Sequence, residues 1–464
     1  GETSTFSIAP LWGLPELAIM AACLAAFVWG AFARTASLPV AFRFQPAIVV
    51  VVTGLFIAAM AQPAQNVLVS TAVAIIIHVD EACAYLLFWT VVALSLDTLD
   101  IPPFRVLGIG DCPYAELKPE LKVALTEYYK VETLENYDEV YRAVAFFLHK
   151  YGRGDWLESN NEYWLERDAH LRDDFNISTG FHSADMAPVK FKSKMKACYE
   201  RAGIPVARYC MADDFETCLA FLKKVGRAVV KPDNGVGANA TYRITNEAEL
   251  RAFFDARHAE SYIMEEYVDG TVCSYDAIVD AAGNPVFETG NVTPGSLMDV
   301  VNEREDSCFF IRKSLPDAVR ERGRAAVKSF GVRSRFIHFE FFSLNSDCHL
   351  GQKGDIVALE VNMRPSGGCS PDMMNYANGV DVYEIWADMI AGNTPDIPAN
   401  PHTFCAFIGR RKEKAYALSH EEILQKYGAH LVEYGEVDKA LAPAMGDYRY
   451  IAKFMTEEEV YAYF

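Results

Sequence analysis

Two apolar segments in the second half of the chain carry charged side chains where charges are costly. RFIHFEFF (335–342) and DIVALEVNMR (355–364) are rich in β-branched, aromatic and other apolar residues, so we expect each to form a strand. Side chains alternate along a strand, so Glu360, Asn362 and Arg364 share one face of the second segment. Charges on a buried face need partners, which favours a functional use over a structural one.

These polar side chains are the kind that bind a hard cation. Glu340 on the first segment, with Glu360 and Asn362 on the second, would offer two carboxylates and an amide oxygen. Such oxygens suit Mg²⁺ (or Mn²⁺), which also binds phosphate oxygens. Arg364 can hold a carboxylate or a developing acyl phosphate through two parallel hydrogen bonds. We therefore expect a metal site beside a substrate clamp.

A lysine at the end of another apolar strand points to phosphate binding. Lys231 lies in VVKPDNGVGAN and is followed by Gly235 and Gly237. A flexible glycine loop can cover phosphates with its N–H groups while the ammonium faces them. The order of a P-loop motif is absent. A surface lysine beside a glycine turn is the common alternative.

The segment KFKSKMKACYERAG (190–203) predicts a helix that ends at Gly203 and Pro205. Lys192 lies near its start, with three further lysines around it: Lys190, Lys194 and Lys196. A solvated basic helix face is the usual explanation of such a run, and phosphate binding is the other.

IMEEYV (263–268) predicts a strand whose backbone could pair with an adenine edge while its apolar side chains cover the ring. A strand that simply runs to the surface explains the pattern equally well. AVVKPD (228–233) predicts a further strand, and ELRAFFDARH (249–258) an amphipathic helix.

Composition excludes one class of partner. The net charge is −19, from 43 basic and 62 acidic residues, so the chain lacks the electrostatic footprint of a nucleic-acid-binding protein. The 11 cysteines are scattered, with no CxxC pair and no zinc spacing. We interpret them as buried or incidental thiols in a reducing compartment.

Most of the excess hydrophobicity lies before residue 98. Residues 14–33, 47–62 and 67–96 are apolar enough to suggest membrane passes. Arg34 and Arg43 lie between the first two, which favours a cytoplasmic loop there and a return to the cytoplasm after residue 96.

The third apolar stretch has a competing interpretation. VAIIIHV, ACAYLLFWTVVALSL and FRVLGIG, within 73–110, could form a strand, a helix and the next strand of one βαβ unit. A buried hydrophobic layer or a dimer interface is a third explanation of the whole region. The sequence leaves these alternatives open.

From Phe104 onward the pattern alternates between strands and helices. We expect a strand at 106–110, a helix at 137–152, and a strand followed by a loop in DWLESNNEYW (155–164). This segment is typical of half a doubly wound sheet, whose ligand loops follow the strands.

Taken in order, these elements resemble the ATP-grasp superfamily, in the branch of biotin carboxylase, carbamoyl-phosphate synthetase and amino-acid ligases. The resemblance covers roughly 104–464 and is most specific at 190–370. It implies that Lys192 and Lys231 contact the phosphates of ATP, with Gly235 and Gly237 in the loop between. It further implies an adenine-contacting stretch at Glu265, Glu266 and Val268, metal ligands Glu340, Glu360 and Asn362, and Arg364 as the clamp on substrate and phosphate.

The implied fold is α/β, with an α+β ATP-grasp domain after a partial doubly wound pre-grasp domain. The implied domains are 1–98 (hydrophobic, membrane-associated, with 73–97 as an alternative first βα unit), 99–185, 186–400 and 401–464. The implied enzyme is an ADP-producing ligase that uses ATP and Mg²⁺ to activate a carboxylate for attack by an amine. Its partners would be these small molecules, with a homodimer compatible, and its catalytic part would be cytoplasmic, attached to the membrane.

Two departures from the family pattern stand out. Thr271 and Val272 follow Gly270, where many relatives have a ribose-binding acid, so Asp269 or Asp276 would have to substitute. The usual first βα unit is replaced by the apolar stretch, through recasting or fusion. The resemblance also places Asn160 and Asn161 on a loop that faces the substrate in relatives.

Other functions remain to be weighed. A catalytically silent ATP-binding module at a membrane is the main alternative, which the intact lysines and carboxylates disfavour. A biotin-dependent carboxylase subunit is weaker, because no Met-Lys-Met acceptor sequence occurs. A transporter is weakest, since the apolar part is small.

Overall fold

The computed structural model describes residues 104–235, 240–256, 260–295, 300, 304–397, 402–439 and 441–464. The chain divides between residues 105 and 106 into two units, and we describe the second, Val106–Phe464. The apolar spans expected within 14–96 and the alternative βα unit at 73–97 lie outside the described residues. Within those described ranges, no helix combines the length and apolar character needed to cross a membrane.

The first described segment is a small α/β unit. Strands β1 (Leu107–Gly110) and β2 (Glu127–Lys130) pair in parallel. The strand expected at 106–110 is confirmed as β1, and the helix expected at 137–152 is confirmed as α6 (Tyr137–Tyr151). The Asn136 side chain caps α6 by accepting a hydrogen bond from the next turn. The other helices here are η1 (Tyr114–Glu116), α5 (Pro119–Ala124), α7 (Leu165–Asp174), η2 (Ser183–Asp185) and α8 (Ala187–Lys190).

The strand expected in residues 155–164 does not form. Residues 155–161 run as a loop. The side chain of Arg172 donates hydrogen bonds of 3.0 and 2.7 Å to the carbonyl oxygen of Leu157. A guanidinium therefore satisfies a backbone group that a neighbouring strand would otherwise bond, and the prediction from apolar pattern alone was wrong.

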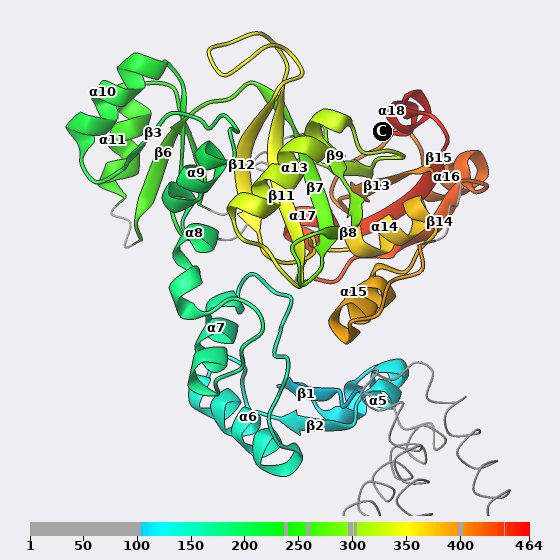
Figure 1. Ribbon diagram of the computed structural model, residues 1–464. Coiled ribbons are helices and arrows are strands. Elements are labelled where there is room, and N and C mark those ends of the chain that lie inside the picture. Colours follow the sequence, from blue (N-terminus) through cyan, green and yellow to red (C-terminus); the bar gives the residue numbers. More distant parts are fainter. Residues whose placement is uncertain are drawn as a thin grey trace, which may run out of the picture. The chain divides into compact units, whose positions relative to one another are not determined.

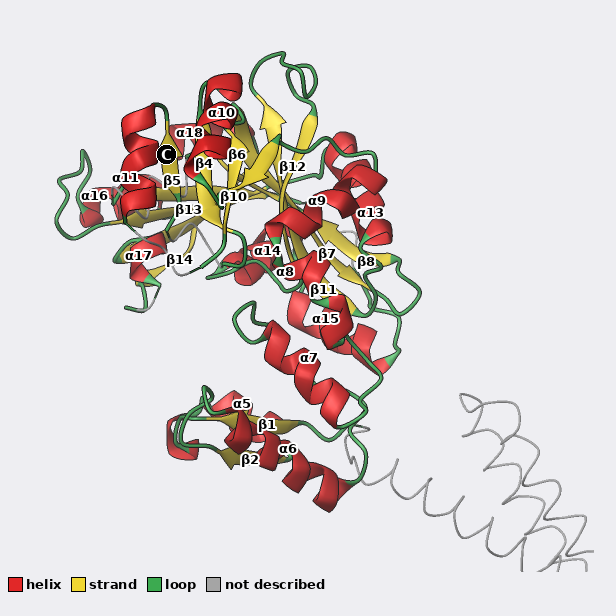
Figure 2. Ribbon diagram, turned by 90° about the vertical axis from the view of Figure 1, so that its left-hand side faces the viewer, coloured by secondary structure: helices red, strands yellow, loops and turns green. Residues whose placement is uncertain are grey.

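A small antiparallel sheet with two helices forms the next part (Figure 2). Its strand order is β3-β6-β4-β5. Helices α10 and α11 pack on it through a core that includes Leu222, Leu250 and Met264. The expected strands at 228–233 and 263–268 are present as β4 and β6. The elements are β3 (Tyr209–Met211), α10 (Phe215–Val225), β4 (Ala228–Pro232), β5 (Tyr242–Ile244), α11 (Glu247–Asp255) and β6 (Tyr262–Glu266).

A large antiparallel sheet follows, in which long strands β12, β11 and β7 lie side by side (Figure 1). Its order is β12-β11-β7-β9-β10-β13-β15-β14, with β8 paired to β7. The strands after residue 402 therefore continue the same sheet. Its strands are β7 (Gly270–Val279), β8 (Pro285–Thr289), β9 (Asn291–Thr293), β10 (Ser307–Ile311), β11 (Arg335–Leu344), β12 (Ile356–Asn362), β13 (Phe404–Arg410), β14 (Leu431–Glu436) and β15 (Tyr448–Phe454).

Helices cover both faces of this sheet. On one face, Phe339 of β11 belongs to a buried cluster with Tyr199 of α9 and Val327 of α13. On the other face, Phe336 packs in a second cluster with Met374 of α14. Alternate residues of β11 therefore serve opposite cores, as the two-residue period requires. The helices are α9 (Lys192–Arg201), α13 (Asp317–Ser329), α14 (Ser370–Asn378), α15 (Val382–Ala391), α16 (His420–Tyr427), α17 (Ala442–Met445) and α18 (Glu457–Tyr463).

Candidate functional site

The expected metal donors meet on neighbouring strands. β11 and β12 pair antiparallel, with Glu340 opposite Glu360 and His338 opposite Asn362. The register shifts just beyond the glutamate pair and leaves Leu359 without a partner, which is a β-bulge. Bulges of this kind redirect side chains and occur often beside active sites. The structure thus places Glu340 opposite Glu360, with Asn362 two residues farther along β12.

Cations compensate the two facing carboxylates. Nζ of Lys192 on α9 lies 3.1 Å from Oε1 of Glu360. Nε2 of His338 lies 3.1 Å from Oε1 of Glu340. Burial alone would raise the pKa of Glu340, but the hydrogen bond and charge of His338, with the charge of Arg364, lower it below its usual range. Each of the two carboxylates therefore has a basic side chain within 3.1 Å.

A buried carboxylate on the neighbouring strand β7 fixes the ring of His338. Its Nδ1 lies 2.7 Å from Oδ1 of Asp276, a fully buried residue on β7. Burial opposes the charged ring, but the charge and hydrogen bond of Asp276 and those of Glu340 outweigh it and raise the pKa of His338 to about 10. Asp276 also accepts a hydrogen bond from Ser274. Asp276 is thus engaged within the sheet, whereas Asp269 is exposed and accepts a hydrogen bond of 3.0 Å from Asn345.

The strand lysine lies in a buried charge cluster. Nζ of Lys231 lies 2.7 Å from Oε2 of Glu265 on β6, and Lys196 pairs with the other oxygen of the same carboxylate. Burial raises the pKa of Glu265, but the charges of the two lysines lower it to about 2. Burial lowers the pKa of Lys231, but Glu265, Glu360 and Glu340 outweigh it and raise the value. The charges of Glu340 and Glu360, the expected metal ligands, thus act on Lys231 together with that of its partner Glu265.

The basic run on α9 is split between the site and solvent. Lys192 and Lys196 are buried, whereas Lys194 is exposed. Lys192 also donates to the backbone oxygen of Gly235 at 2.9 Å, which joins the helix to the glycine loop. The solvated-face interpretation therefore holds for Lys194 alone of these three. The spacing of four residues between Lys192 and Lys196 was a usable signal, because such residues share one helix face.

Of the remaining residues expected to contact the nucleotide, Glu266 and Val268 lie within the described part of the chain. Glu266 accepts a 2.7 Å hydrogen bond from Nε of Arg208, and Nε2 of His349 lies 3.1 Å from it, so its carboxylate is engaged within the protein. Val268 is buried among apolar neighbours just after β6. Gly237 lies outside the described residues.

Arg364 lies beside the metal donors. It donates to the carbonyl oxygen of Pro365 at 2.7 Å and to Oδ1 of Asn362 at 3.4 Å. In the same turn, the hydroxyl of Ser366 is buried and has no hydrogen-bond partner among the described residues. The turn thus holds a guanidinium and an unused hydroxyl at the end of β12.

The donor chemistry fits a hard cation. No group of three or more His, Cys, Asp or Glu side chains in the described ranges is arranged to hold a metal. The expected set has two carboxylates and one amide oxygen, which are ligands that Mg²⁺ accepts together with phosphate oxygens and water. Lys192 and His338 contact the carboxylates from the protein side, so a cation would share those oxygens with them.

Comparisons with known proteins give the fold. No protein-family model matches the sequence, and no curated protein does. Among solved structures, the chain is similar to an L-amino acid ligase from Bacillus licheniformis, with TM-score 0.58 and 15% identity over 78% of this chain and 96% of that one.

Two further solved structures give a similar result. One is an N5-carboxyaminoimidazole ribonucleotide synthetase from Thermotoga maritima, with TM-score 0.53 and 16% identity over 78% of this chain and 90% of that one. The other is the biotin carboxylase domain of a 2-oxoglutarate carboxylase from Hydrogenobacter thermophilus, in complex with MgADP, ADP and bicarbonate. It has TM-score 0.53 and 15% identity over 77% of this chain and 82% of that one. The expected fold is confirmed: the described part of the chain has the ATP-grasp fold.

Proposed function

We propose that the chain is an ATP-dependent ligase that activates a carboxylate as an acyl phosphate for attack by an amine. One observation carries this proposal: Lys192 of α9 lies 3.1 Å from Glu360 of β12, so the expected phosphate lysine and the expected metal edge form one site. The similar solved structures include an L-amino acid ligase and a complex with MgADP, which supports the same class of reaction.

The charges of the site suit a nucleotide triphosphate with a divalent cation. Mg²⁺ would supply charge neutralisation and would be held by Glu340, Glu360 and Asn362. Lys192 and Lys231 would bind phosphate oxygens, since both ammonium groups are buried within the same cluster of carboxylates. Pairing with Glu360 and Glu265 orients these lysines before the nucleotide arrives.

The reaction then needs positioning more than acid–base chemistry. A carboxylate oxygen of the substrate bonds to the γ-phosphorus, the bond to the bridging oxygen breaks, and ADP leaves. The amine nitrogen attacks the acyl carbon, the C–N bond forms, phosphate leaves, and the nitrogen gives its proton to solvent. Arg364 would hold the substrate carboxylate through paired hydrogen bonds beside the donors of β12.

Nucleotide binding would extend along β6. We place adenine near Val268, where the strand ends and its apolar neighbours are buried, and the ribose near Asp269. The expected attachment to a membrane through residues 14–96, the cytoplasmic location of the catalytic part and the homodimer stay predictions.

ADP release by the purified full chain, measured against a panel of carboxylates and amines, tests the proposal. We expect at least one pair of substrates to raise ADP release above that of Glu360→Ala. If every pair gives the rate of that variant, the chain is not a ligase of this class for the panel, and the proposal loses its support.

A further inference from the structure

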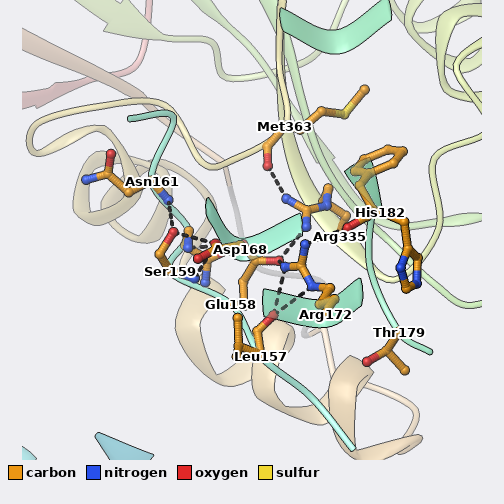
Figure 3. Close-up of polar contacts among 12 residues, drawn as sticks. Leu157, Glu158, Ser159, Asn161, Asp168, Arg172, Thr179, His182, Arg335 and Met363 are labelled. Carbon is orange, nitrogen blue, oxygen red and sulfur yellow. Dashed lines mark hydrogen bonds and ion pairs between the residues drawn. The ribbon is translucent and has the colours of Figure 1, made fainter. Parts of the chain in front are cut away.

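A second buried charge cluster contains none of the residues proposed to bind the nucleotide, and the proposed reaction does not use it directly. Figure 3 shows its side chains. It consists of Glu158, Arg172 and Arg335, whose side chains are 3%, 0% and 1% exposed. Oε2 of Glu158 accepts hydrogen bonds from both guanidinium groups, at 2.9 Å from Arg172. We call these three residues the Glu158 cluster. Buried ions are costly even when paired, so a cluster of this kind is weak evidence for stability and calls for another explanation.

Arg172 serves the loop. It donates to the carbonyl oxygens of Leu157 and Phe181, the latter at 2.8 Å, and so fixes residues 157 and 181 to helix α7. Its hydrogen bonds all stay within the first described segment, and it shares the Glu158 carboxylate with Arg335. Loss of the Arg172 guanidinium group should therefore loosen the loop and leave β12 in place.

Arg335 connects Glu158 to the end of β12. It is the first residue of β11, and it donates to the carbonyl oxygen of Met363. Met363 lies between Asn362 and Arg364 in the chain, and its own side chain is fully buried. A hydrogen bond to this carbonyl fixes the orientation of the peptide that joins Met363 to Arg364.

A second buried ion pair holds the other end of the same loop. Nζ of Lys190 donates to the backbone oxygen of Glu162 at 3.0 Å and lies 3.2 Å from its carboxylate, with both side chains under one-tenth exposed. Lys190 precedes Lys192 by two residues. The loop from Glu158 to Glu162 is therefore tied at one end to Arg335 of β11 and at the other to Lys190, the last residue of α8.

We propose that Arg335 is a positioning residue, which holds Asn362 and Arg364 in place through the Met363 carbonyl and couples them to the loop through Glu158. This inference rests on the proposed function, which assigns Asn362 as a metal ligand and Arg364 as the substrate clamp. The Arg335 guanidinium has donors for both partners at once, whereas a lysine can serve only one of them well. Partners that orient metal ligands change metal affinity when they are lost, which a purely structural ion pair would not do.

The test compares Arg335→Lys with Arg172→Lys in the full chain. Both variants keep the positive charge and replace a guanidinium group that donates to Glu158. Of the two arginines, Arg335 is the one that donates to the carbonyl oxygen of Met363. The first readout is the affinity for Mn²⁺ in the presence of a non-hydrolysable ATP analogue, measured by electron paramagnetic resonance. The second is ADP release with the best pair of substrates, separated into kcat and KM for ATP.

We expect Arg335→Lys to weaken Mn²⁺ binding about tenfold or more and to lower kcat with little change in KM for ATP. Arg172→Lys should lower the melting temperature but leave Mn²⁺ affinity near that of the wild type. If Arg335→Lys does not fold, Glu158→Gln replaces it, because that variant keeps the shape and weakens the hold on Arg335. We expect it to weaken Mn²⁺ binding in the same direction.

Equal losses of Mn²⁺ affinity in both lysine variants, or no loss in Arg335→Lys, overturn the positioning role. So does unchanged Mn²⁺ affinity in Glu158→Gln where that variant is needed. A wild type that binds Mn²⁺ with the analogue but releases no ADP contradicts the ligase proposal and leaves this comparison valid. A wild type that binds no Mn²⁺ overturns both proposals.

Discussion

Lys192 on helix α9 and Glu360 on strand β12 form a buried ion pair of 3.1 Å, although the chain between them builds most of two sheets. The same lysine donates to the backbone oxygen of Gly235 in the glycine loop. One ammonium thus contacts both the proposed phosphate loop and the proposed metal edge. Changes at this position should therefore affect nucleotide binding and metal dependence together.

Replacement of Lys192 by methionine should lower ADP release by about 10²-fold, because a preorganised positive charge beside the phosphates is lost. Lys194→Met is the matched control, since Lys194 lies two residues along the same helix and is exposed. Steady-state rates at saturating ATP and Mg²⁺ give the comparison. Similar rates for both variants would show that Lys192 does not act on the phosphates.

Glu360→Gln should raise the Mg²⁺ concentration needed for half-maximal ADP release and lower the rate about 10²-fold, because one anionic oxygen donor becomes neutral. The variant keeps the shape of the side chain, so the sheet should fold. Glu433→Gln, on β14 at the far edge of the same sheet, is the control. An unchanged Mg²⁺ requirement in Glu360→Gln would remove Glu360 from the metal ligands.

The sequence predicts the polar face of β12 well, because a strand's two-residue period is local. Glu360, Asn362 and Arg364 needed only that period to be placed together. The partner across the sheet could not be read in this way. That Glu340 lies opposite Glu360, with Leu359 bulged beside them, depends on pairing register between strands.

Contacts between distant segments explain what the sequence did not predict. Arg172 of α7 and Arg335 of β11 both contact Glu158. No sequence motif links the three residues, so their contact could not be predicted from the sequence. Glu158 lies in the segment 155–164, where we expected a strand followed by a loop and where residues 155–161 run as a loop. His338 was missed for a similar reason, since its partner Asp276 belongs to another strand.

Gly323→Ala should destabilise the protein by about 1–3 kcal/mol, because a new methyl group would overpack a full core. Gly323 is buried in α13, and a Cβ there would overlap the ring of Tyr275 on β7. That ring is fully buried and its hydroxyl donates to Glu288 at 2.7 Å, so it has little freedom to move away. Urea unfolding at pH 7 measures the loss.

The control for this substitution is Gly226→Ser. Gly226 ends α10 with φ of 79°, and a Cβ there would meet no atom within 4 Å, so any cost reflects backbone strain alone. We expect the loss in Gly323→Ala to be accompanied by a change in the near-ultraviolet signal of buried aromatic rings, and the loss in Gly226→Ser to lack it. Full stability in Gly323→Ala would mean that α13 does not pack on β7 as described.

The stability of the protein should fall in acid partly through Glu265. The charges of Lys196 and Lys231 overcome the effect of burial and lower the pKa of this carboxyl from 4.5 to about 2 in the folded state. A carboxyl whose pKa is lower folded than unfolded contributes stability that is complete above pH 4.5 and is lost as the pH falls towards 2. The shift corresponds to roughly 2–4 kcal/mol for this group.

Glu265→Gln isolates that contribution. At pH 7 the variant should be less stable than the wild type, because two buried ammonium groups lose their shared anion. Between pH 5 and 3 its urea midpoint should fall less steeply than that of the wild type, so the two curves should converge in acid. Glu247→Gln, which alters an exposed pair with Arg251, should give a curve parallel to the wild type. A Glu265→Gln curve that is also parallel would show that the lysines do not hold this carboxylate in the folded protein.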